Sequence, residues 1–301
     1  MQKLIVLCAY SLCVLLTACG AAPAQVADAA SVNSAETLQD ACNFSGTWAI
    51  RFEIPVQWPA SVAVEAGRGT VYQWAKVERQ HQGLALHDVV SVCGTLVPDS
   101  RAREEFNREL YGIDFPDSLF DSGKLPTTTM ATTLAGQRPG DGFAMGGITV
   151  TLGLDMPQAD TAVWPSRARD LRTLDTDGDG HPGITLWARQ APPYSGPPVN
   201  VFRTKHAAKF YVALRNVVQR ASGKIDSCDA MSGTAIIPVI ANKAALNSHI
   251  VGCQRTDGKA CSLSEADMVD KAQSGYSLAG AAKLTMRRVT PQTSCAQIRA
   301  M

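Results

Sequence analysis

The chain has 301 residues, of which 28 are Lys or Arg and 27 are Asp or Glu, so its formal net charge is only +1. This balance excludes the electrostatic signature of a nucleic-acid-binding protein, and we expect no nucleic acid as a partner. Hydrophobic residues make up 46% of the chain, enough for a sizeable core, and no apolar run is long enough to span a membrane as a helix.

The first residues have the layout of an export signal. Lys3 supplies a positive charge, and the apolar run over residues 4–16 is shorter than the roughly 20 residues that span a bilayer. The run leads into Leu16-Thr17-Ala18-Cys19, which resembles the lipobox of bacterial lipoproteins. The resemblance implies cleavage before Cys19, acylation of its thiol and amine, and stable anchoring by two or more acyl chains such as palmitate.

The resemblance covers only the first twenty residues, and composition predicts how the rest of the chain is organised. We expect a signal peptide over residues 1–18, a lipidated flexible tether over 19–41 and a single disulfide-stapled β domain over 42–301. The tether is rich in Ala and lacks aromatic residues, so it cannot bury enough surface to fold by itself. Gly20 follows Cys19 where an Asp would favour the inner membrane, so we expect an exported protein anchored to the cell envelope at the outer membrane.

Six cysteines follow Cys19, an even number that suits an oxidising compartment. Because no C-x-x-C pair exists to begin a zinc site, we expect three disulfides, with about 15 connectivities open. The preferred pairs are Cys42–Cys93, Cys253–Cys261 around an Asp-Gly turn, and, by elimination, Cys228–Cys295.

The clearest predicted strand begins a few residues after Cys42. Large apolar side chains occupy its alternate positions: Trp48, Ile50, Phe52, Ile54, Val56 and Trp58. A period of two places all six on one face of a strand, which we expect to be buried. Pro55 cannot donate a hydrogen bond, which predicts that the strand lies at a sheet edge or carries a bulge there.

Further elements are predicted along the rest of the chain. Residues 70–77 and 84–93 form a hairpin around a turn at 80–83, residues 101–110 are helical or exposed, and residues 114–142 form long loops. Later strands are expected over 148–154, 184–189, 209–220, 234–240, 245–253 and 278–289, with a Pro-rich connection over 190–198. A Ser222-Gly223-Lys224 turn ends the strand over 209–220. Ser262 and Glu265 form a capping box that begins a short helix.

Strands therefore dominate this pattern. Short strands separated by turns are typical of all-β domains, and helical periodicity is sparse. The sequence predicts a mainly β fold, an antiparallel barrel or sandwich with long loops and one or two short helices.

The sharpest local motif is the Asp-rich stretch over residues 175–183. Asp175, Asp177 and Asp179 alternate before a Gly, as in the first half of an EF-hand loop, which the stretch resembles. The resemblance implies a calcium ion held by these three carboxylates and the main-chain carbonyl of His181. Leu186 occupies the position of the usual bidentate Glu, so the missing ligand must come from elsewhere, from Asp170 or Asp155 or from water. The alternative is a solvated Asp-Gly turn without an ion.

Gly46-Thr47-Trp48 resembles the Gly-x-Trp signature in the first strand of lipocalins. That resemblance implies a barrel that Trp48 closes at its base and that holds a small apolar ligand. The alternative is a Trp packed in the core at the start of a strand. The five histidines have no paired spacing and no G-x-S-x-G elbow occurs, so no catalytic residue is assigned.

These patterns predict a membrane-anchored exported lipoprotein that acts as a non-enzymatic binding or structural module. Calcium is its one candidate cofactor. The alternatives are a lipocalin-like carrier of a small apolar ligand and an envelope hydrolase. Beyond the membrane that holds the lipid on Cys19, the candidate partners are an apolar ligand or another envelope protein.

Overall fold

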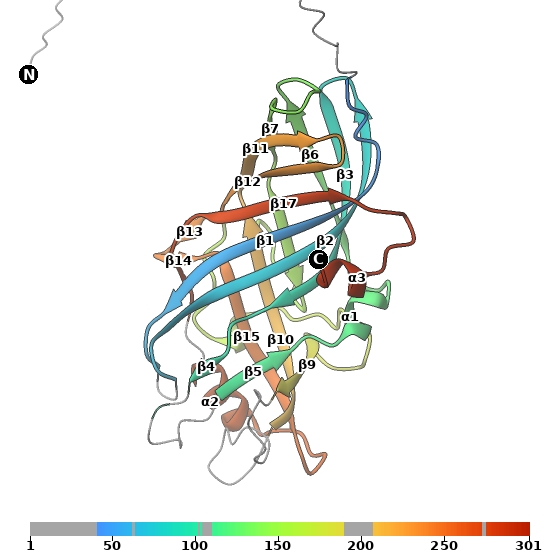
Figure 1. Ribbon diagram of the computed structural model, residues 1–301. Helices are drawn as coiled ribbons and strands as arrows, with labels where there is room; N and C mark the ends of the chain where they lie inside the picture. Colours follow the sequence, from blue (N-terminus) through green and yellow to red (C-terminus); the bar gives the residue numbers. More distant parts are fainter. Residues whose placement is uncertain (1–40, 62–63, 102, 104–109, 190–206, 273–274) are drawn as a thin grey trace, which may run out of the picture. The chain divides into compact units, whose positions relative to one another are not determined.

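The computed structural model describes residues 41–301 apart from 62–63, 102, 104–109, 190–206 and 273–274 (Figure 1). The lipobox with Cys19, the signal peptide and almost all of the predicted tether lie outside the described residues and stay predictions. The same holds for the connection predicted over 190–198 and for most of the segment 101–110.

Eight antiparallel strands close into a barrel (Figure 1). They follow the order β1-β17-β12-β11-β7-β6-β3-β2, and the pairing of β2 with β1 completes the ring. The strands are β1 (Gly46–Trp58), β2 (Gly67–Gln82), β3 (Ala85–Leu96), β6 (Thr127–Leu134), β7 (Gly142–Met145), β11 (Arg220–Ser227), β12 (Ala230–Ile236) and β17 (Ala282–Arg288). The predicted mainly β fold is confirmed, and of its two predicted forms the barrel is the one present.

Strand β1 has the predicted alternation, with its six large apolar side chains at most 6% exposed. Pro55, however, lies neither at an edge nor at a bulge, so that prediction is wrong. On one side β1 pairs with β2 without interruption. On the other side its partner changes from β17 to β16 (Ser277–Leu278) beside Pro55, so the ladder is already interrupted where the proline lacks an N–H. The carbonyl of Pro55 accepts the N–H of Ala279 at 2.9 Å.

Two barrel strands continue into a second antiparallel sheet, which belongs to the same compact unit. Strand β7 leads through Gly146-Gly147 into β8, and β10 leads through Gln219 into β11. This sheet contains β4 (Ser100–Arg101), β5 (Leu110–Asp114), β8 (Ile148–Leu152), β9 (Ile184–Arg189), β10 (Ala207–Val218) and β15 (Leu246–Arg255). A small hairpin of β13 (Val239–Ile240) and β14 (Lys243–Ala244) precedes β15.

The described residues form three α-helices, one more than the prediction of one or two allowed. The predicted one is α2 (Leu263–Ala272), where Ser262 N donates to Glu265 Oε2 at 2.7 Å in the expected capping box. The others are α1 (Asp117–Asp121) and α3 (Cys295–Arg299). No helix in the described part of the chain combines the length and the apolar character needed to cross a bilayer.

Two stretches that the sequence predicted as loop or turn are strands. The predicted loop region 114–142 contains β6, whose Met130, Thr132 and Leu134 are buried on its inward face. The predicted turn around Gly223 lies inside β11, directly opposite Gly233 of β12. A Cβ at Gly223 would collide with the backbone of β12, so this glycine permits two strands to approach closely.

Three disulfides link the six cysteines: Cys42–Cys228, Cys93–Cys295 and Cys253–Cys261. Of the predicted pairs, Cys253–Cys261 is confirmed, whereas Cys42–Cys93 and Cys228–Cys295 are wrong. Barrel closure explains both errors. It brings the turn after β11 next to the start of β1, and α3 packs on the outer side of β3, beside Cys93.

Candidate functional site

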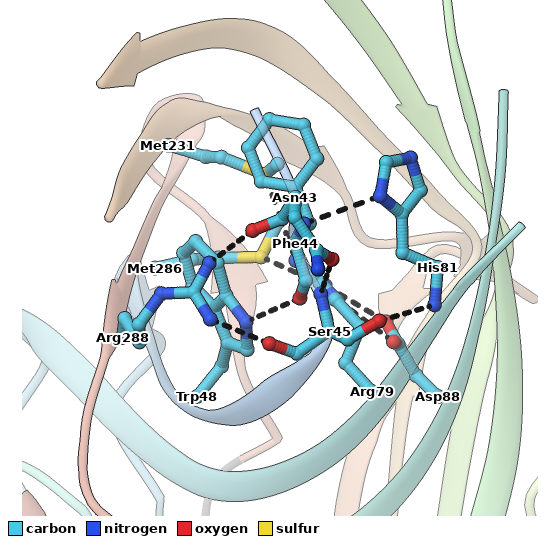
Figure 2. Close-up of polar contacts among 10 residues, drawn as sticks. All are labelled: Asn43, Phe44, Ser45, Trp48, Arg79, His81, Asp88, Met231, Met286 and Arg288. Carbon is cyan, nitrogen blue, oxygen red and sulfur yellow. Dashed lines mark hydrogen bonds and ion pairs between the residues drawn. The ribbon is translucent and has the colours of Figure 1, made fainter. Parts of the chain in front are cut away.

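Trp48 lies at one end of the barrel, beside two guanidinium groups (Figure 2). Its indole is fully buried, and the Cζ atoms of Arg79 and Arg288 lie 4.9 and 5.0 Å from the ring centre. The indole Nε1 donates to the carbonyl of Phe44 at 2.9 Å. Each cation is attracted to the electron-rich face of the ring, so Trp48 makes specific electrostatic contacts in addition to its apolar packing in the core.

Arg288, at the end of β17, holds the segment 43–45, which leads into β1, across this end of the barrel (Figure 2). Its guanidinium donates to the main-chain carbonyls of Asn43, Ser45 and Cys228, and its Nε pairs with Asp229 at 2.6 Å. The Cys42–Cys228 disulfide adds a covalent link at the same place. This end is therefore closed by the polypeptide itself.

A buried ion pair lies just inside the closed end (Figure 2). Arg79 Nε donates to Asp88 Oδ1 and Nη2 to Oδ2, both at 2.8 Å, and neither side chain has exposed surface. The guanidinium also donates to the sulfur atoms of Met231 and Met286 at 3.7 and 3.5 Å. Because each charge is matched by its partner, the pair offers no free charge to a ligand.

Side chains fill the barrel interior. The inward-facing apolar side chains of the strands pack into one hydrophobic cluster, and those in the middle of β1, β6 and β12, such as Phe52, Met130 and Met231, are at most 5% exposed. A cavity wide enough for a ligand would leave accessible surface on the side chains that line it. The described part of the barrel is therefore a packed core and not an open calyx.

A hollow of about 850 Å³ opens at the opposite end of the barrel, outside this core. Its walls come from the end of β1, the start of β2, the β13–β14 hairpin and the segment that leads into β16. The rings of Trp58 and Tyr276 meet edge to face there, with centroids 5.9 Å apart. Burial raises the pKa of the Tyr276 hydroxyl to about 12, so this group stays neutral. Arg68 and Lys243 also line the hollow.

The structure brings the three predicted calcium ligands together. Carboxylate oxygens of Asp175, Asp177 and Asp179 lie within 4.8 Å of one another, and among the described residues they are the only such acidic group. Asp175 accepts the N–H groups of Gly178 and Gly180 at 2.7 and 2.9 Å. Hydrogen bonds from Gly180 and its neighbours outweigh slight desolvation and hold the pKa of Asp175 below its usual range.

Asp177 differs from its neighbours in the loop. Its Oδ2 accepts the N–H of Thr185 at 2.8 Å, whereas its Oδ1 is buried without a hydrogen-bond partner. Burial first, and then the charge of Asp179, raises the pKa of this carboxyl. An unpaired buried carboxylate oxygen beside two other carboxylates is the environment that a divalent cation would relieve.

His181 and Leu186 complete the comparison with the EF-hand pattern. The ring of His181 stacks on Tyr211 with centroids 4.2 Å apart, and the main-chain N–H of His181 donates to Asp179 Oδ1 at 3.0 Å. Leu186 lies in β9 and is buried, so the twelfth position supplies no ligand. Asp155, another acidic residue near this loop, pairs with Arg172 at 2.8 Å.

A buried His–Asp pair lies on the second sheet. His249 of β15 directs Nδ1 to Asp270 of α2 at 2.7 Å and Nε2 to the carbonyl of Pro165 at 2.9 Å, while Trp164 stacks on the ring. Burial opposes its protonation, but the bonds to Asp270 and Pro165 and the Asp270 charge outweigh it, so the pKa of His249 is raised. Both ring nitrogens face acceptors, an arrangement that favours the doubly protonated form of the ring.

That arrangement does not suit a catalytic dyad. A general base needs a ring nitrogen that is free to accept a proton from a nucleophile, and Nε2 of His249 donates to Pro165 instead. The His249–Asp270 pair therefore acts as a link between β15 and α2.

Searches against protein-family models, characterised proteins and solved structures gave no significant match.

Sequence reasoning missed the hollow and the ion pair for different reasons. The hollow is assembled from segments that are far apart in sequence. Arg79 and Asp88 are directly opposite in the β2–β3 hairpin, but the predicted strand ended at residue 77 and the predicted turn began at residue 80, so the predicted register did not pair them. Arg79 also shares a strand face with Val77, which places a charge on the apolar side.

Proposed function

We propose that the chain is an exported lipoprotein, anchored at the outer membrane through lipid on Cys19, whose folded part is a non-enzymatic binding or structural module. The observation that supports this most is the packed barrel core. Because the described side chains inside the barrel leave little accessible surface, we expect partners to be recognised on the outer surface of the domain.

The lipocalin-like carrier is the alternative that this packing disfavours. A neutral apolar dye such as phenylnaphthylamine becomes fluorescent when it enters an apolar cavity. We expect the purified domain, residues 42–301, to give no saturable rise in dye fluorescence. Stoichiometric uptake of the dye would instead support a carrier and remove the basis of the proposed module.

The anchoring half of the proposal is tested in cells with an alkyne analogue of palmitate. The wild-type protein should carry the label, and Cys19→Ala should lose it and accumulate as uncleaved precursor. Cys13→Ala is the matched control, because that cysteine lies in the predicted signal peptide and should not affect labelling. Normal processing and release of Cys19→Ala would contradict a lipid anchor.

Calcium is proposed as a structural ligand of the Asp175–Asp179 loop. The supporting observation is the buried Oδ1 atom of Asp177, which has no partner and lies beside two further carboxylates. The three carboxylates repel one another when no cation is present, and a bound calcium ion would neutralise that repulsion. It would also fix the loop ahead of β9, where Asp177 and Asp179 already contact Thr185.

A further inference from the structure

The hollow beside Trp58 is lined by basic but no acidic side chains, whereas the chain as a whole has nearly equal numbers of both. Arg68 and Lys243 line it from two different strands, β2 and β14, and none of its lining residues is acidic. Within the described residues, neither cation forms an ion pair with a carboxylate. Two unpaired positive charges therefore border one concave surface, which favours an anionic group.

The remaining walls of the hollow supply apolar contact. Trp58 and Tyr276 are largely buried, and their edge-to-face packing fixes both rings at the base. The indole N–H of Trp58 is occupied by the carbonyl of Glu65 at 3.0 Å, so the small part of this residue that reaches the hollow, 6% of its surface, offers no hydrogen-bond donor from the ring. Pro59, Ala60 and Ala66 are exposed and add small apolar contacts at the rim.

The hollow is held in place by the fold and does not depend on long side chains alone. Gly67 of β2 lies so close to the indole of Trp58 that a side chain there would collide with the ring, and a side chain at Gly69 would collide with Pro98. Ser277 Oγ donates to the carbonyl of Gln57 and joins β16 to the end of β1. A site whose walls are fixed before binding loses little entropy when a ligand enters.

We propose that this hollow binds a small amphiphilic anion, whose carboxylate or phosphate lies between Arg68 and Lys243 and whose apolar part contacts Trp58 and Tyr276. The inference rests on the proposed function, because it identifies the outer-surface site that a packed barrel requires. Its volume of about 850 Å³ is within the range of small-molecule sites.

The test uses two dyes that differ by one charged group, anilinonaphthalene sulfonate and the neutral phenylnaphthylamine, on the whole folded domain. We expect one sulfonate dye per chain, with affinity that falls as salt rises, and no binding of the neutral dye. Arg68→Gln with Lys243→Gln should weaken the sulfonate dye by about tenfold, since two exposed charge pairs are lost. The matched control is Arg220→Gln with Lys283→Gln, two exposed cations elsewhere on the barrel, and it should bind like the wild type.

A steric variant tests the location without changing charge. Ala66→Trp should fill the hollow and abolish binding of the sulfonate dye, whereas Ala144→Trp on the exposed side of β7 should not. Competition then identifies the ligand class: dodecanoate or dodecyl phosphate should displace the dye, and inorganic phosphate at the same concentration should not. Displacement by inorganic phosphate would overturn the role of the aromatic walls.

The failures can be told apart. If Arg68→Gln with Lys243→Gln, or Ala66→Trp, binds the sulfonate dye like the wild type, the hollow is not the site, but the proposed surface-binding module stands. If the neutral dye binds with one-to-one stoichiometry and Ala66→Trp leaves that binding intact, the barrel interior takes up ligand. Both the proposed function and this inference would then be wrong.

Discussion

Arg79 and Asp88 face each other across the β2–β3 hairpin and form a two-point ion pair inside the barrel, with both donor–acceptor distances at 2.8 Å. The pair is shielded completely from solvent and lies under Trp48, whose ring contacts the guanidinium. Taking two charges out of water is costly, and the pair is stable only while both members are present. This makes it the most sensitive point of the closed end.

Asp88→Leu should therefore lower the free energy of unfolding by about 3–5 kcal/mol, because the charge of Arg79 stays buried without a partner. Arg79→Met combined with Asp88→Leu should recover most of the loss, since no unpaired charge remains. Urea unfolding of both variants measures the effect. A loss below about 1 kcal/mol for Asp88→Leu would mean that Arg79 finds solvent or another partner.

Phe52→Ala tests the packing of the barrel core. The side chain faces inward from the middle of β1 and is 4% exposed, so its removal leaves a cavity. We expect a loss of about 3–5 kcal/mol in the free energy of unfolding. Lys283→Ala is the control, because Lys283 is exposed on the neighbouring strand and pairs with Glu53 in register. Equal losses for the two variants would contradict a packed interior.

Local patterns predicted part of this fold well. The alternation in β1, the strand of β9 and the capping box of α2 depend on residues within a few positions of each other, and all three are present. Strand β6 was missed because its inward residues alternate Thr with apolar side chains and resemble a polar loop. The sequence also carries a local signal for the start of helix α3, the capping box of Ser294 and Gln297.

Long-range features were beyond local patterns. Cys42 and Cys228 are 186 residues apart and meet only because the barrel closes. Gly223 looks like a turn residue in isolation, and only the pairing with Gly233 explains it. The hollow beside Trp58 likewise needs β1, β2 and the β13–β14 hairpin in place. The Asp-rich loop was predictable because its three carboxylates are adjacent in sequence.

The disulfides should differ in their contribution to stability. The Cys42–Cys228 bond closes a sequence separation of 186 residues and Cys253–Cys261 one of 8. Chain-entropy estimates give about 5 kcal/mol for the long loop and about 2.5 kcal/mol for the short one. Cys42→Ala with Cys228→Ala should thus destabilise the domain more than Cys253→Ala with Cys261→Ala, as measured by urea unfolding. The reverse ranking would show that loop length does not control the effect.

Calcium should stabilise the folded domain by mass action. A ligand at one hundred times its dissociation constant adds about 2.7 kcal/mol to the free energy of unfolding. Without a bidentate Glu, we expect a dissociation constant of roughly 10⁻⁴–10⁻³ M. Millimolar calcium is about one to ten times this constant, so it should add about 0.4–1.4 kcal/mol and raise the melting curves above those with chelator. The same rise is expected for Asp160→Asn, the matched control at an exposed residue outside the cluster. Asp177→Asn with Asp179→Asn should not respond, and identical wild-type curves would leave the loop as a turn only.

The His249–Asp270 pair should make stability depend on pH with a definite sign. The pKa of His249 is raised in the folded protein, against burial and Lys243, by its bonds to Asp270 and Pro165 and by the Asp270 charge. A histidine in the unfolded chain has a pKa of about 6.5, so the stabilisation of the folded state by the pair is complete below that pH. It is lost as pH rises through the higher folded pKa, where the imidazolium that donates to both acceptors becomes neutral.

His249→Gln removes the titrating group, so the difference in free energy of unfolding between the wild type and this variant isolates the effect. That difference should be largest in mildly acidic buffer and should shrink as the pH is raised into the alkaline range. His87→Gln, which changes an exposed histidine of β3, is the control and should give a difference that stays small and flat. If the gap between wild type and His249→Gln widens with rising pH, the folded state favours the neutral ring, in which one nitrogen must accept a hydrogen bond. Neither the Pro165 carbonyl nor the ionised Asp270 carboxylate can donate one, so this result would contradict the two acceptors that the ring faces.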